Sequence, residues 1–98
     1  MIGYEYHPAA ELEYHEAIKY YAKIHGELAL RFVEEVEAAV QRAREFPEVY
    51  GRIGIGLRHV VTRRFPFLIV YEVRPDRIFI WAVAHGSRAP GYWRERLS

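Results

Sequence analysis

The 98-residue sequence contains no cysteine and no asparagine, and it has only one methionine and one glutamine. Without cysteine, neither a disulfide framework nor a thiolate metal site can form. No apolar run approaches the roughly 20 residues that span a bilayer, and the first residues lack the basic start and apolar stretch of a secretory signal. These absences predict a soluble cytoplasmic protein.

What the sequence does contain is typical of a folded domain. Hydrophobic residues make up 51% of the chain, which excludes a disordered composition. We expect one domain over residues 1–98, because a chain this short builds a single core.

Neither a metal site nor a cofactor site is expected. His7, Glu11 and His15 have helical spacing, but Pro8 moves His7 to a cap position, so an exposed charged stripe is the better interpretation. The glycines in residues 51–56 follow a predicted helix and precede a predicted strand, which reverses the order of a dinucleotide-binding loop.

Charge is distributed unevenly, although the net charge is only +1. Residues 1–49 contain five Lys or Arg and ten Glu (−5), whereas residues 50–98 contain nine Arg and three acids (+6). This asymmetry indicates an anionic partner for the second half, because arginine binds phosphate or carboxylate through two parallel bonds. Solvated surface arginines are the alternative.

Two amphipathic helices are predicted in the first half. The first begins at His7-Pro8, since proline at the first helical position loses no needed N–H. It ends near His25-Gly26, where glycine suits a helix C-terminus. The second carries an apolar stripe from Leu28 to Ala43 and stops at Phe46-Pro47. The short link between them predicts an antiparallel helical hairpin.

After Pro47 the periodicity changes to the alternation of strands. Strands are predicted at residues 57–62, 67–73 and 78–83, and they form an antiparallel meander. A short strand at residues 2–6 is a candidate for extending it. With the helical hairpin packed on one face of the sheet, the fold class is α+β.

Residues that could bind or cleave a nucleic acid gather in the second half. If Arg58 and His85 meet at a common sheet edge, the histidine could transfer protons and the arginine could stabilise a phosphorane. Tyr92 and Trp93 could stack on exposed bases. Together these side chains predict metal-free RNA cleavage.

Each of these residues also has a structural interpretation. His85 fits a hydrogen-bonded histidine at a strand end, and Ser87 beside it lies in no nucleophile motif. Tyr92 and Trp93 would pack the tail onto the sheet. Arg58 alternates with a leucine, which places it on the face away from the core as a solvated residue.

Four short motifs follow one another in the second half: Gly56–His59, Arg64–Tyr71, Ile80–His85 and Arg88–Trp93. In this order they resemble the RelE/ParE family of toxins, and the order of elements fits that family over nearly the whole chain. The resemblance implies an α+β toxin of a type II toxin–antitoxin system, neutralised by an antitoxin whose acidic C-terminal segment wraps around it.

The resemblance leaves two targets open. RelE-like members cut messenger RNA inside the ribosome, whereas ParE-like members trap DNA gyrase. The absence of lysine after Lys23 removes a lysine base, and the strand at residues 65–71 looks nearer to ParE. A gyrase poison is therefore favoured, with a ribosome-dependent mRNA endonuclease as the alternative. The residues that match a RelE-type catalytic site are Arg58, Arg63, His85 and Tyr92.

In both cases an acidic antitoxin is the expected partner, with no membrane and no small-molecule cofactor involved. Nine arginines on a small sheet would repel one another unless an acidic partner covers them, which predicts tight, salt-sensitive binding. The residues predicted to bind this partner are Arg58, Arg64, Arg88, Trp93, Arg94 and Arg96.

Overall fold

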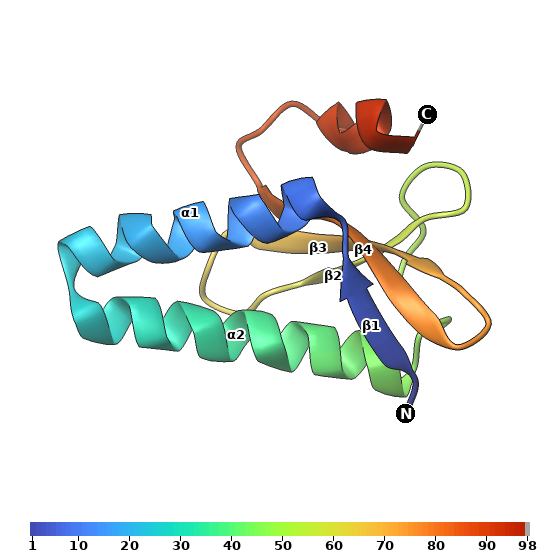
Figure 1. The fold of residues 1–98 in the computed structure, drawn as a ribbon, viewed down its shortest axis with the longest axis horizontal. Coiled ribbons are helices and arrows are strands. Elements are labelled where there is room, and N and C mark those ends of the chain that lie inside the picture. Colours follow the sequence, from blue (N-terminus) through green and yellow to red (C-terminus); the bar gives the residue numbers. More distant parts are fainter. Residues whose placement is uncertain (98) are drawn as a thin grey trace.

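The structure is a computed structural model that describes residues 1–97, in which two helices pack on one face of a four-stranded sheet (Figure 1). The elements are, in order, β1 (Gly3–Tyr6), α1 (Pro8–Ile24), α2 (Gly26–Glu45), β2 (Arg58–Val61), β3 (Phe67–Val73), β4 (Arg77–His85) and the short 3₁₀ helix η1 (Tyr92–Leu97). This arrangement confirms the predicted α+β fold.

The residue that connects the two helices of the hairpin is a histidine, His25, and not a glycine. At the start of α1, Pro8 lies in the first turn and His7 caps the helix through its Nδ1 atom. His25 is the last cap of α1 and the first cap of α2, and its Nδ1 atom accepts a hydrogen bond from the Glu27 N–H at 3.1 Å. The first helix ends next to His25-Gly26, as predicted, but the capping residue is His25, and Gly26 is already the first residue of α2.

The sheet has the order β1-β4-β3-β2. Strands β2, β3 and β4 form the predicted antiparallel meander, while β1 adds to β4 in parallel. The pairing of β1 stops at Tyr6, opposite Ile80, so the remainder of β4 has one edge that β1 leaves uncovered. A register shift between Val70 and Tyr71 leaves Trp81 without a partner on β3.

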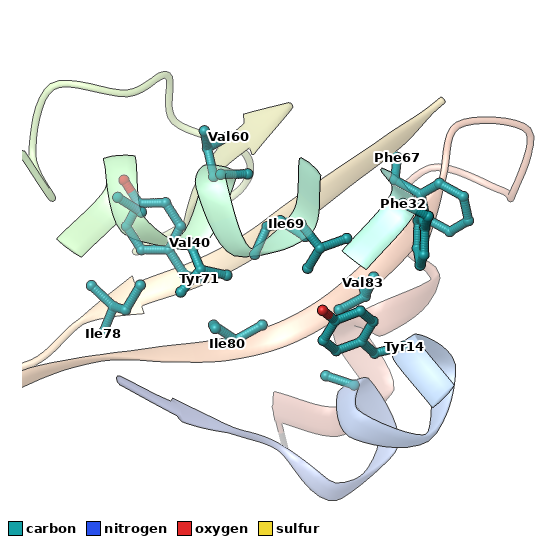
Figure 2. Close-up of a cluster of buried hydrophobic side chains, with 14 residues drawn as sticks. Tyr14, Phe32, Val40, Val60, Phe67, Ile69, Tyr71, Ile78, Ile80 and Val83 are labelled. Carbon is teal, nitrogen blue, oxygen red and sulfur yellow. The ribbon is translucent and has the colours of Figure 1, made fainter. Parts of the chain in front are cut away.

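Both faces of the sheet are buried. The main core lies between the sheet and the helices (Figure 2), where Phe32, Ile69 and Ile80 are fully buried. Full burial of such a side chain contributes about 1.5–3 kcal/mol. A second apolar cluster occupies the opposite face, where Trp93 of η1 packs against Leu57 and its neighbours. The tail is therefore part of the folded core.

The two apolar faces explain a wrong prediction about Arg58. In the β2–β3 register, Arg58 lies opposite Tyr71 and Val60 lies opposite Ile69, and these partners belong to the main core. Arg58 therefore lies on the helix-facing side of the sheet, at its end. Leu57 is buried on the other face, under Trp93.

Candidate functional site

One carboxylate holds the C-terminal tail on the sheet. Glu13 of α1 accepts hydrogen bonds from the Tyr92 hydroxyl at 2.5 Å and from the two Nη atoms of Arg96 at 3.0 and 2.7 Å. It also accepts from the Val83 N–H at 3.0 Å, and Arg96 donates to the Trp81 carbonyl at 2.8 Å. Glu13 and Arg96 thus pair backbone groups on the stretch of β4 that β1 leaves uncovered.

This network is largely shielded from water. The side chains of Glu13 and Arg96 are 14% and 17% exposed. Arg88 stacks over the Tyr92 ring at 3.8 Å and lies 3.7 Å from Glu13. Burial, together with the hydrogen bond to Glu13, raises the pKa of Tyr92 well above its ordinary value. The Tyr92 hydroxyl therefore stays protonated and engaged, which does not suit a catalytic base.

Two of the residues predicted to bind the partner, Trp93 and Arg96, make contacts within the chain. Trp93 is only 5% exposed and anchors the second apolar cluster. Arg96 is committed to Glu13 and to the β4 backbone. These contacts favour the structural interpretation, in which the tail packs onto the sheet.

The hydrogen bonds of His85 fix its tautomer. Its Nδ1 atom accepts from the Ser87 N–H at 3.0 Å and lies 2.7 Å from the Ser87 hydroxyl oxygen. Because a backbone N–H can only donate, Nδ1 carries no proton, and in the neutral imidazole the proton is on Nε2. The ring also packs edge-on against Phe67, with the centroids 5.1 Å apart. His85 is thus a hydrogen-bonded residue at a strand end, with no lone pair available to a substrate.

The prediction that Arg58 and His85 meet at a common edge is wrong. Arg58 pairs with Tyr71 at one end of the meander, whereas His85 pairs with Phe67 at the other end. Their partners on β3 are four positions apart, which is about 13 Å along the strand, and β3 itself lies between the two residues. Arg63, in the β2–β3 turn, lies at the His85 end. The RelE-type set does not assemble around one phosphate.

The nine arginines of the second half fall into two groups. Carboxylates within 4.0 Å pair four of them: Arg74 with Glu72, Arg77 with Glu5 and Asp76, and both Arg88 and Arg96 with Glu13. Among residues 1–97, the other five have no carboxylate at that distance, and we call them the open arginines. They are Arg52, Arg58, Arg63, Arg64 and Arg94.

Most of the open arginines follow the outer edge of the sheet. The backbone of Arg52 forms an isolated antiparallel β-bridge with that of Arg58 at the start of β2. The Arg58 guanidinium donates a hydrogen bond to the Tyr50 carbonyl at 2.8 Å. Arg63 and Arg64 follow β2 directly and are exposed. Among residues 1–97, the arginines that have no carboxylate partner are therefore limited to this group, and the predicted mutual repulsion of all nine arginines reduces to it.

Arg64 is held in a backbone conformation that suits glycine. Its φ is 67°, and it is the only non-glycine residue with positive φ among the residues described. The conformation costs an L-residue about 1–2 kcal/mol. The Thr62 hydroxyl stabilises the turn by donating to the Phe65 carbonyl at 2.7 Å.

Sequence reasoning missed two features of this region. Glu13 was one of several acids between apolar helix positions, and nothing in its spacing distinguishes it from its neighbours. Ile55 lies between two glycines with φ of 76° and 74° and is 99% exposed. An isoleucine flanked by Gly54 and Gly56 is the one signal in the sequence that could have identified an exposed apolar loop tip.

Residues 1–97 contain neither a group of potential metal ligands nor a membrane-spanning helix. No three His, Asp or Glu side chains within residues 1–97 are grouped so that they could hold a metal ion. Within the same residues, the helices are too short or too polar to cross a bilayer.

Comparison with known proteins places this architecture in a class. The fold is similar to that of a chain of the chromosomal ParDE TA system from P. aeruginosa, with a TM-score of 0.75 and 21% sequence identity, over 87% of this chain and 96% of that chain. The protein therefore has the RelE/ParE toxin fold, as its motifs suggested. No curated protein matches the sequence.

The family follows from the sequence itself. The model of the ParE toxin of the type II toxin–antitoxin system parDE matches residues 4–90. The chain belongs to the ParE toxin family. It is thus a toxin of a type II system, whose partner is a cognate antitoxin.

Proposed function

We propose that this toxin acts by binding and poisoning DNA gyrase, and that an acidic antitoxin segment holds it inactive by covering the open arginines. Membership of the ParE family supports the first part. The charge of the β2 edge supports the second, because Arg63 and Arg64, which are exposed and have no carboxylate partner among residues 1–97, are suited to bind carboxylates through paired hydrogen bonds. An action on gyrase places the protein in the cytoplasm.

One observation carries this proposal: the residues that a nuclease would need either make hydrogen bonds within the chain or lie far from one another. Metal-free RNA cleavage requires a base for the 2′-hydroxyl proton and an arginine at the same phosphate. His85 uses Nδ1 to accept from the Ser87 N–H, and Tyr92 uses its hydroxyl to donate to Glu13. Arg58 lies at the far end of the meander. This arrangement supports binding rather than catalysis.

The test is controlled expression of the wild-type chain, His85→Ala and Tyr92→Phe in a susceptible bacterium. We expect all three to arrest growth, with intact messenger RNA and with gyrase trapped on broken DNA. Purified wild-type protein should also inhibit supercoiling by isolated gyrase. Codon-phased cuts in messages on translating ribosomes, present with the wild type and lost in His85→Ala, would instead establish the nuclease and overturn the proposal.

A further inference from the structure

The outward face of α1 carries apolar side chains that the fold does not bury. Leu12, Tyr20 and Ile24 are 58%, 62% and 59% exposed, and none of them belongs to either apolar cluster. Their spacing of eight and four residues places them along one side of the helix, over about 18 Å, and we call them the α1 stripe. Exposed apolar residues scattered singly are ordinary, but three in line along a helix indicate a surface that a partner covers.

Charged residues on α1 are ordered along the helix axis. Glu11 and Glu16 lie in its N-terminal half, and Lys19 and Lys23, the only lysines of the chain, lie in its C-terminal half. All four are exposed. Within residues 1–97, neither ammonium group has a carboxylate within 4.0 Å, and Glu16 has no cationic partner at that distance. The helix dipole favours this order of charges, but it does not account for the apolar side chains that lie between them.

A second copy of this face, running antiparallel, is complementary to the first. About a two-fold axis at the middle of the stripe, Leu12 lies opposite Ile24 of the second copy, and Glu16 lies opposite its Tyr20. The opposing Lys19 is then next to Glu16, whose carboxylate gains a hydroxyl and an ammonium as donors. A parallel pair would instead bring Glu16 beside Glu16 and Lys19 beside Lys19, which is repulsive.

We infer that two copies of this chain associate through α1 in this antiparallel arrangement. The α1 stripe of each copy covers that of the other, and Glu16 of each pairs with Lys19 of the other. The order of charges favours this occupant over an anionic membrane, because a membrane would attract the lysines but repel Glu11 and Glu16 on the same helix. A single helix pair buries less than the roughly 1,200 Å² of a stable complex, so we expect a weak, concentration-dependent dimer.

This dimer goes beyond the proposed function and leaves the β2 edge free. α1 packs over β4, whereas α2 lies over β2, the strand that most of the open arginines follow. A loss of self-association and a loss of gyrase inhibition can therefore be measured separately on the same variants.

The test is sedimentation equilibrium of the purified full-length toxin over concentrations of about 5 to 500 μM. We expect a reversible monomer–dimer equilibrium with a dissociation constant of about 50 μM. Leu12→Gln removes one apolar contact at each end of the pair and should raise that constant at least about 5-fold. Val49→Gln is the matched control, because Val49 is 73% exposed and lies outside α1, and it should dimerise like the wild type.

Exchanging charges tests the antiparallel geometry itself. Glu16→Lys would face Lys19 of the second copy, and Lys19→Glu would face Glu16, so each variant alone should associate at least about 10-fold more weakly. An equimolar mixture of the two should dimerise to within about 3-fold of the wild type, because both contacts then join opposite charges. Glu34→Lys, at an exposed position of α2, is the control for a reversed charge away from α1 and should leave the dimer unchanged.

Three results would overturn the inference. A wild-type toxin that stays monomeric at about 500 μM has no such interface. Equal association of the wild type and Leu12→Gln, or a mixture of folded charge variants that does not recover, shows that the copies meet on another face or in another geometry. Co-sedimentation of the wild type with phosphatidylglycerol vesicles, lost in Lys19→Glu and without self-association, assigns the face to a membrane. Gyrase inhibition by the same proteins reports separately on the proposed function in each case.

Discussion

Two groups of arginines on one small sheet have different roles. On the side of β4 and the tail, Arg77 and Arg96 each lie within 2.8 Å of a carboxylate oxygen. Along β2 and its flanking loops, Arg63 and Arg64 have no such partner among the residues described. Among residues 1–97, the chain thus pairs its arginines with carboxylates on the β4 side of the sheet and leaves those along β2 without one.

Glu13 accounts for much of this difference. It comes from the acidic first half of the chain, and it pairs Arg96, Tyr92 and one backbone N–H of β4. The opposite net charges of the two halves of the sequence are therefore partly neutralised by contacts within the fold. Only the remainder, the five open arginines, is available to an anionic partner.

The largest predicted effect concerns Glu13, which pairs with Arg96 on the β4 side of the sheet. Glu13→Ala leaves the shielded Arg96 guanidinium without its carboxylate and the Val83 N–H without an acceptor, so the free energy of unfolding should fall by about 3 kcal/mol. Urea denaturation of the purified toxin measures this change. Glu16→Ala, an exposed acid on the same helix, should change it by less than about 0.5 kcal/mol. Equal losses in the two variants would remove the special role of Glu13.

Alkaline pH should destabilise the fold through two partly buried tyrosines, Tyr92 of the tail and Tyr71 of β3. The pKa of Tyr92 is raised by burial and by Glu13, and burial raises the pKa of Tyr71 from 10.0 to about 12. An acid whose pKa is raised on folding stabilises the protein below its unfolded value, and that contribution is lost as pH rises. Unfolding midpoints in urea should therefore decline steeply between pH 10 and 12. The decline should be shallower in Tyr92→Phe and Tyr71→Phe, and an unchanged slope would contradict the assignment.

The smallest predicted effect concerns Arg64, one of the open arginines along β2. Arg64→Gly relieves the positive φ of 67°, so we expect it to stabilise the fold by about 1 kcal/mol while it weakens antitoxin binding. Thermal unfolding and a binding titration on the same sample measure the two changes. Arg64→Lys keeps the strain and the charge but loses the guanidinium fork. A variant that is both less stable and fully competent in binding would show that Arg64 serves the turn alone.

Most of the fold follows from local patterns in the sequence. The helix start at His7-Pro8 and the bounds of β3, Phe67–Val73, are as predicted, because proline geometry and β-branched runs act locally. The end of the first helix near His25-Gly26 is also as predicted, although His25 supplies the cap in place of the glycine: its backbone caps α1 and its imidazole caps α2. The parallel pairing of β1 depends on contacts far apart in the sequence.

The candidate site is less predictable, since it depends on register. Arg58 and His85 were expected to meet, yet β3 separates them and their partners on it are four residues apart. The role of Glu13 arises only when α1 crosses the uncovered stretch of β4. Composition identified the arginines as important, but only the fold shows which of them have a counter-ion.

The most direct test of the account is antitoxin binding by two double variants with the same change in charge. Arg52→Gln with Arg63→Gln removes two open arginines, and Arg74→Gln with Arg77→Gln removes two paired ones. We predict that the first weakens binding of the cognate antitoxin by about 50-fold at low salt and by much less at high salt, while the second changes it by less than about 3-fold. Equal losses in both, or no loss in the first, would contradict the claim that the open arginines form the antitoxin-binding surface.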